Sequence, residues 1–112
     1  MHILFDKNVP FGLRRFLNPH KNETLDDRGW ARLRNGDLIK SAESSGFDLV
    51  ITADQNIVYQ QNLEGRRIAL LVLGSNIWPI VRTHAAQIAS EVNASKSGTY
   101  AFLEMPIPRK SK

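Results

Sequence analysis

Two apolar stretches that each end in an aspartate decide the fold of this chain, HILFD at residues 2–6 and FDLVITAD at residues 47–54. Each stretch is short and rich in Leu, Ile, Val or Phe, which is typical of a strand buried on both faces of a parallel sheet. In open α/β sheets the carboxyl ends of such strands face the ligand crevice. We therefore expect Asp6 and Asp54 to converge at one edge of the sheet.

Two carboxylates held close together repel one another, and a divalent metal is the usual means of offsetting that repulsion. Hard cations such as Mg²⁺ or Mn²⁺ select carboxylate oxygens and retain several waters. The pattern therefore favours a metal site at Asp6 and Asp54. The alternative is that each aspartate caps the loop or helix that follows it, which is a common role for Asp.

The rest of the chain alternates between strand and helix patterns. Further strands are expected at 20–25, 67–73 and 99–105, of which the first is weakly patterned and suits a sheet edge. Helices are expected at 11–17, 36–45, 55–63 and 78–92, with a loop or short helix over 26–34. Right-handed crossovers place helices on both faces of a parallel sheet, so we predict a three-layer α/β/α fold with a mainly parallel central sheet.

Length and composition narrow the class of protein. A chain of 112 residues supports a single domain, here with a basic tail at 106–112. Cysteine is absent, which excludes disulfides and thiolate zinc sites and is compatible with a reducing cytoplasm. No apolar stretch approaches the roughly 18 residues needed to span a bilayer, so we expect a cytoplasmic protein with no membrane partner.

The charge balance favours a polyanionic partner. Fifteen Lys and Arg residues give a net charge of +4, and Arg offers a planar fork for phosphate oxygens. The candidates for contacts to an RNA backbone are Arg14, Arg15, Arg32 and Arg34. The alternative is that these arginines lie on solvated helix faces, as in many moderately basic proteins.

A third carboxylate for a metal site should come from the helix that leads into the second of the two deciding strands, because the start of that helix lies along the same sheet edge. Asp37 occupies this position. Its alternative role is to complement the helix dipole, which is worth roughly 0.3–1 kcal/mol.

Several segments together carry a family resemblance: ILFDKNVP at 3–10, Gly29-Trp30, NGDLI at 35–39 with Ala42-Glu43, and VITADQN at 50–56. In this order and spacing they resemble the short stand-alone PIN-like nucleases, which are related to the VapC-type ribonucleases. Many members of that branch are predicted toxins of toxin–antitoxin pairs.

The resemblance implies a PIN-like fold and hydrolysis of RNA phosphodiester bonds with Mg²⁺ or Mn²⁺ held by acidic residues. Asp6 and Asp54 match the two strand-end aspartates of the family. The helix-start acid most often falls on the position of Asn35, so either Asp37 substitutes for it or the site has two firm carboxylates. The resemblance also implies an antitoxin protein as a partner, and Trp78 with the apolar helix after it could contribute to a homodimer.

Polar residues beside the expected acids are candidates for binding substrate. Asn8, Thr52, Gln55 and Asn56 could orient water or phosphate, and Asn35 lies at the start of the helix that carries Asp37. For Thr52 and Asn56 the alternative is hydrogen bonding within loops and caps.

Two other functions compete with a ribonuclease. A PIN-like fold with a weakened site could bind RNA or a protein partner without cleaving. A receiver-like signalling module would also place Asp6 and Asp54 at strand ends, but it predicts an adjacent acidic pair after the first strand and a lysine after a late strand. The chain has Lys7 and Gly74-Ser75 at these places.

Overall fold

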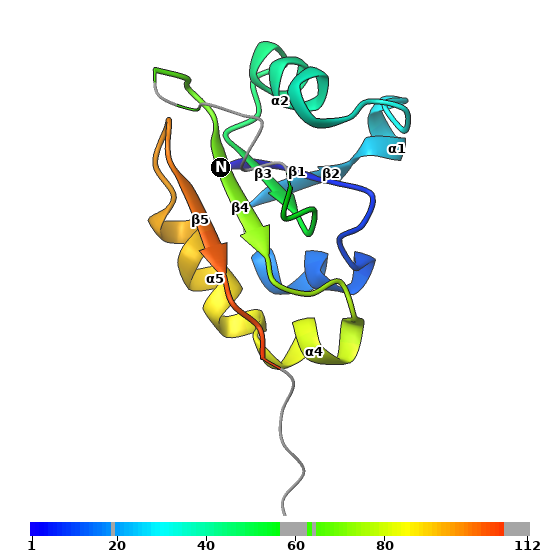
Figure 1. Cartoon of the computed structure of the whole chain (residues 1–112), viewed down its shortest axis with the longest axis vertical. Helices are drawn as coiled ribbons and strands as arrows, with labels where there is room; N and C mark the ends of the chain where they lie inside the picture. The colour runs from blue at the N-terminus through cyan, green and yellow to red at the C-terminus, as the bar shows by residue number, and fades with distance from the viewer. Residues whose placement is uncertain (19, 57–62, 64, 107–112) are drawn as a thin grey trace, which may run out of the picture.

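A parallel five-stranded sheet forms the centre of the molecule, as the computed structural model shows for residues 1–18, 20–56, 63 and 65–106 (Figure 1). Its strands are β1 (His2–Phe5), β2 (Lys21–Thr24), β3 (Leu49–Thr52), β4 (Ala69–Leu73) and β5 (Tyr100–Leu103). They lie in the order β2-β1-β3-β4-β5, and every neighbouring pair is parallel. The weakly patterned second strand lies at one edge, as expected, and the last strand lies at the other.

Helices cover both faces of this sheet. They are η1 (Phe11–Leu17), α1 (Leu25–Arg28), α2 (Asn35–Ser44), α4 (Trp78–Thr83) and α5 (Ala85–Ala94). Figure 1 shows α1 and α2 at the top of the view, with η1 and α4 at the bottom and α5 behind β4 and β5. The predicted three-layer α/β/α fold is confirmed.

The two-residue period of the strands sorts their side chains between two cores. In β1 and β3 the odd-numbered Ile3, Phe5, Leu49 and Ile51 pack with η1, α4 and α5. The even-numbered Leu4 and Val50 face the other way, into the core that contains Leu38, Ile39 and Ala42 of α2. A residue that continues either strand at an even number therefore points toward the α2 side.

Two expected helices differ in detail. The segment 11–17 is a 3₁₀ helix, in which the Leu13 amide donates to the Pro10 carbonyl at 3.1 Å. The helix expected at 78–92 divides at His84, because the Thr83 hydroxyl donates to the Ile80 carbonyl at 2.7 Å and competes with the helical backbone bond.

Two expected segments extend beyond the described residues. Of the helix expected at 55–63, positions 57–62 lie outside the described part of the chain, and so does the basic tail from 107 onward.

The direction in which strands are added reverses between β1 and β3. From β1 the chain first adds β2 on one side, and it then adds β3, β4 and β5 in turn on the other. In doubly wound sheets the two crossovers at such a point diverge to opposite faces and leave a crevice at the carboxyl ends of the strands. Asp6 follows β1 and Asp54 follows β3, so the two aspartates flank this point.

Candidate active site

The carboxyl ends of β1 and β3 bring Asp6 and Thr52 face to face. Phe5 pairs with Ile51 in the parallel register, and the Asp6 amide continues the ladder by donating to the Ile51 carbonyl at 2.9 Å. Asp6 directly follows β1 and Thr52 is the last residue of β3; both positions are even-numbered, so both lie on the α2 side. Their side chains meet there, and the Thr52 hydroxyl donates to Asp6 Oδ2 at 2.7 Å.

Thr52 also connects this pair to Asp54. Its Oγ1 accepts a hydrogen bond from the Asp54 amide at 3.0 Å. Thr52 is fully buried, and a buried hydroxyl is costly unless its hydrogen bonds are made. One threonine therefore orients the first carboxylate and shapes the turn that carries the second.

The side chains of Asp6, Asn8 and Asp54 hold the loops that follow β1 and β3. Asp6 Oδ1 accepts from the Lys7 amide at 2.7 Å, and Asp54 Oδ1 accepts from the Asn56 amide at 3.0 Å. Asn8 Oδ1 accepts from the Ala53 amide at 3.0 Å, which ties the β1 turn to the end of β3. The loop-capping roles considered for both aspartates are present, and they leave Asp54 Oδ2 without a hydrogen-bond partner among the described residues.

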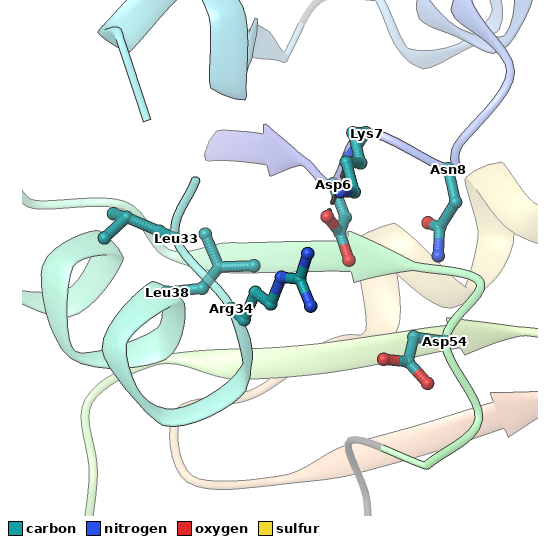
Figure 2. A pocket seen from close by; sticks show the side chains of 7 residues that line it. All are labelled: Asp6, Lys7, Asn8, Leu33, Arg34, Leu38 and Asp54. Carbon is teal, nitrogen blue, oxygen red and sulfur yellow. Dashed lines mark hydrogen bonds between the residues drawn. The ribbon is translucent and has the colours of Figure 1, made fainter. Parts of the chain in front are cut away.

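A hollow of about 300 Å³ opens at this edge. Its polar walls are Asp6, Lys7, Asn8, Arg34 and Asp54, and its apolar wall is formed by Leu33 and Leu38. Figure 2 shows the Arg34 side chain extending from the start of α2 toward the carboxylates of Asp6 and Asp54. The hollow is therefore closed on one side by α2 and on the other by the two strand ends.

Arg34 occupies an unusual place for a cation. It is the N-cap residue of α2 and its side chain makes no capping hydrogen bond. A positive charge at a helix N-terminus is disfavoured by roughly 0.3–1 kcal/mol. Arg34 shares the hollow with the carboxylates of Asp6 and Asp54, although no ion pair within 4.0 Å joins Arg34 to a described acidic residue.

The structure does not bring the third expected carboxylate into the hollow. Asp37 is exposed in the first turn of α2 and is not among the residues that line the hollow. There its negative charge complements the helix dipole and the neighbouring Arg34. Asn35 is the first residue of α2. Within the described ranges, no group of three or more Asp, Glu, His or Cys side chains could hold a metal.

The remaining candidates lie around the hollow rather than in it. Gln55 and Asn56 are exposed in the turn after β3, while Arg15 and Arg32 are exposed and do not line the hollow. Arg14 is committed elsewhere, since its Nε donates to Asn22 Oδ1 and its Nη2 donates to the Asn22 carbonyl at 3.1 Å. Of the four expected RNA-binding arginines, only Arg34 lines the hollow.

Lys7 and the apolar pair Leu33 and Leu38 were not expected at the site. Lys7 directly follows Asp6, so its proximity to the strand end was a usable signal. Leu33 and Leu38 gave no such signal, because apolar residues that flank a helix start more often serve the core.

Comparison with known proteins adds no family to these observations. No protein-family model, curated protein or solved structure matches this chain. The resemblance to PIN-like nucleases stays a prediction from the sequence. Among the described residues, no helix is both long enough and apolar enough to cross a bilayer.

Proposed function

We propose that this protein hydrolyses phosphodiester bonds of RNA with the help of Mg²⁺ or Mn²⁺. One observation carries the proposal: Asp6 and Asp54 line a single hollow at the switch point of the sheet, together with Lys7 and Arg34. Paired carboxylates suit a hard cation, and nearby Lys and Arg suit a phosphate. A hollow with both kinds of charge suits a metal-bound phosphate better than either ligand alone.

The donor set of the hollow fits such a metal ion. Mg²⁺ is commonly held by one or two protein carboxylates, while waters and substrate phosphates complete its coordination. Asp54 has a carboxylate oxygen to offer, and Asp6 is oriented by the Thr52 hydroxyl. Asp6 and Asp54 would hold the ion, which when bound lowers the pKa of a coordinated water and offsets charge on the phosphate oxygens.

The residues of the hollow then have separate tasks. Thr52 holds the Asp6 carboxylate in one orientation, and Asn8 holds the loop between Thr52 and Asp54 in place. Lys7 and Arg34 attract the phosphate and offset the negative charge that grows on its oxygens during cleavage. Leu33 and Leu38 exclude water from the α2 side and so strengthen these interactions.

The choice of RNA and a toxin role neutralised by an antitoxin rest on the resemblance to PIN-like nucleases. The net charge of +4 supports a polyanionic substrate. A small gene abutting this one would support the toxin role. In a homodimer, Ile77 could contribute an apolar contact, because 53% of its surface is exposed; the neighbouring Trp78 is half-buried against the core.

The strand order favours one second candidate, a receiver-like phosphoacceptor module. The order β2-β1-β3-β4-β5 is common among doubly wound sheets that bind ligands between the first and third strands. Asp54 would then accept a phosphoryl group. Lys7 in place of a second acid and Gly74 after β4 count against this function. A phosphoacceptor module predicts that acetyl phosphate adds one phosphate to wild type but none to Asp54→Asn.

Single-turnover cleavage of a labelled single-stranded RNA in Mn²⁺ tests the hydrolase. We expect Asp6→Asn and Asp54→Asn each to slow cleavage more than about 100-fold, beyond the effect of losing a residue that only orients a metal ligand. Asp37→Asn is the matched control, because it removes an equal charge from the same sheet edge outside the hollow. Its cleavage rate should stay within about threefold of wild type, since the lost attraction between Asp37 and the helix dipole is worth only about 0.3–1 kcal/mol of stability.

Three further results bear on the same proposal. RNA affinity should fall steeply between low and physiological salt, because contacts to phosphates release counterions. A loss of cleavage in Asp37→Asn as large as in Asp54→Asn would show that Asp37 takes the helix-start role after all. Absence of metal-dependent cleavage in both wild type and Asn35→Asp, with RNA binding retained, would contradict the hydrolase and favour a binding module.

A further inference from the structure

A second hollow adjoins the first and shares two of its walls. Its volume is about 150 Å³, half that of the first, and Asp6 and Lys7 line both. Its other walls include Phe11 at the start of η1 and Asp26 in α1. A phosphate bound in the first hollow would therefore have the second hollow immediately beside it.

Phe11 leaves its ring in solvent at the rim of the second hollow. Its exposed fraction is 70%, the largest among the exposed apolar side chains of the described residues. Burying a Phe side chain is worth roughly 1.5–3 kcal/mol relative to exposing it. Folding alone does not explain why this ring remains uncovered beside a cluster of charged groups.

The exposed ring is held in a defined position. The Arg14 guanidinium lies 4.9 Å from the centroid of the Phe11 ring. Arg14 is in turn hydrogen-bonded to both the side chain and the backbone carbonyl of Asn22 in β2. A ring fixed from one side by an immobilised guanidinium is a platform on which a flat group can stack.

Asp26 supplies a hydrogen-bond acceptor to the same hollow. The capping box of α1 uses Thr24 and Asp27, which leaves the exposed Asp26 carboxylate without a hydrogen-bond or ion-pair partner among the described residues. Carboxylates accept hydrogen bonds from the exocyclic amine of cytosine. Adenine and guanine carry exocyclic amines too, whereas uracil carries none: its one donor on the Watson–Crick edge, N3–H, lies between two carbonyl oxygens, which a carboxylate repels.

We infer that the second hollow binds the base of a nucleotide adjoining the phosphate held in the first. In this arrangement, which rests on the proposed function, the base stacks on Phe11 and its amine donates to Asp26. Stacking on an aromatic ring is tolerant of base identity. Asp26 therefore sets the preference, which is for an amine-bearing base and against uracil at this one position.

The test compares binding of fluorescein-labelled hexamers of cytidine and of uridine by anisotropy in Mg²⁺, with short mixing times so that binding precedes cleavage. Wild type should bind the cytidine hexamer at least about tenfold more tightly, within the discrimination that a hydrogen bond to a base edge provides. Phe11→Ala should weaken binding of the cytidine hexamer about 5- to 150-fold, the loss typical of one stacked base.

Two control variants separate this subsite from general effects of substitution. Phe16→Ala removes a second exposed Phe of η1, whose ring lies 6.2 Å from that of Trp78 and outside the hollow, and should leave affinity within about twofold. Asp26→Asn keeps an acceptor but adds an amide donor, so it should bind the uridine hexamer better. The ratio of the affinities for the cytidine and uridine hexamers should therefore fall at least about threefold.

The outcomes also separate this inference from the proposed hydrolase. Loss of binding in Phe11→Ala with a cytidine preference that depends on Asp26 supports the base subsite even in a protein that does not cleave RNA. Equal affinities of Phe11→Ala, Phe16→Ala and wild type would overturn the subsite, even if RNA cleavage depends on Asp54. Equal binding of both hexamers by wild type would overturn the role of Asp26.

Discussion

Replacing Thr52 by valine should destabilise the protein by about 2 kcal/mol without changing the shape of the core. Thr52 is fully buried and its hydroxyl makes two hydrogen bonds, one to the Asp6 carboxylate and one from the Asp54 amide. A hydrogen bond to a charged group contributes roughly 1.5–3 kcal/mol and a neutral one about 0.5–1.5 kcal/mol. Asp6 and Asp54 are half-buried, so water recovers part of this sum in the variant.

Urea denaturation at neutral pH measures the change. With m-values of about 1–3 kcal/mol/M for small proteins, the expected loss moves the midpoint by about 1 M at constant m. A double-mutant cycle of Thr52→Val with Asp6→Ala isolates the bond between the two side chains, and its coupling energy should be about 1–2 kcal/mol.

The affinity for Mn²⁺ provides a second test of the role of the Thr52 hydroxyl. Losing a side chain that orients a metal ligand typically costs about 10- to 100-fold in metal affinity. Calorimetry in saturating inorganic phosphate should show that Thr52→Val weakens Mn²⁺ binding by such a factor, whereas Thr52→Ser, which keeps the hydroxyl, should bind Mn²⁺ nearly as wild type does. Stability of Thr52→Val within about 0.5 kcal/mol of wild type, together with a coupling near zero, would refute the role of this hydroxyl.

Three other perturbations test the sheet edges and the hollow. A hydrogen bond from Arg28 lowers the pKa of Glu23, so the ionised carboxylate stabilises the fold at neutral pH and this contribution is lost as the pH falls. In a series of urea titrations, the stability advantage of wild type over Glu23→Gln should therefore shrink below about pH 4.5. A constant difference in stability down to about pH 2 would contradict this role of Glu23. Gly74→Ala should lose about 1–3 kcal/mol in urea denaturation, because the new Cβ would lie 2.9 Å from the Met105 amide nitrogen and 3.0 Å from the Leu103 carbonyl oxygen; unchanged stability would mean that the end of β5 shifts freely. Saturating inorganic phosphate should increase the Mn²⁺ affinity of wild type, measured by calorimetry, by a factor about 5 to 150 times larger than it increases that of Asp54→Asn. Equal Mn²⁺ affinities of wild type with and without phosphate would show that the two ligands bind independently.

The period of two in the strands was sufficient to predict much of the fold and part of the site. Leu4 and Val50 are apolar at even positions, so the side on which Asp6 and Thr52 emerge follows from counting along each strand. The sequence could not reveal that Thr52 bridges the two loops, because that depends on the register of Phe5 with Ile51, which is a long-range pairing.

Local propensity was a poorer guide to the helices than to the strands. The apolar spacing around Val81 and Ile88 continues through His84 without interruption, so it predicts one helix. The helix breaks because the Thr83 hydroxyl competes with the backbone donor for the Ile80 carbonyl. The spacing of apolar residues does not reveal such competition.

The second hollow illustrates a different limit of sequence reasoning. Trp30 and Trp78 are the aromatic residues whose size first suggests base stacking, yet both are half-buried and pack against the two cores. Phe11 resembles an ordinary core residue of a short helix. In the structure Leu13 and Leu17 of η1 are buried, whereas Phe11 stays exposed and meets Arg14, its neighbour one 3₁₀ turn along the helix.

The charges of the hollow explain how two carboxylates could suffice where three would otherwise be expected. Lys7 and Arg34 line the same hollow as Asp6 and Asp54, and positive charges beside two carboxylates reduce their mutual repulsion with or without a metal. A divalent ion entering alone would meet two cations and bind weakly, whereas an ion that enters with a phosphate brings the anion that both cations lack. In the proposed reaction the substrate would supply the negative charge and the oxygen ligands that the exposed Asp37 of α2 does not provide, and the ion would be held tightly only together with a phosphodiester.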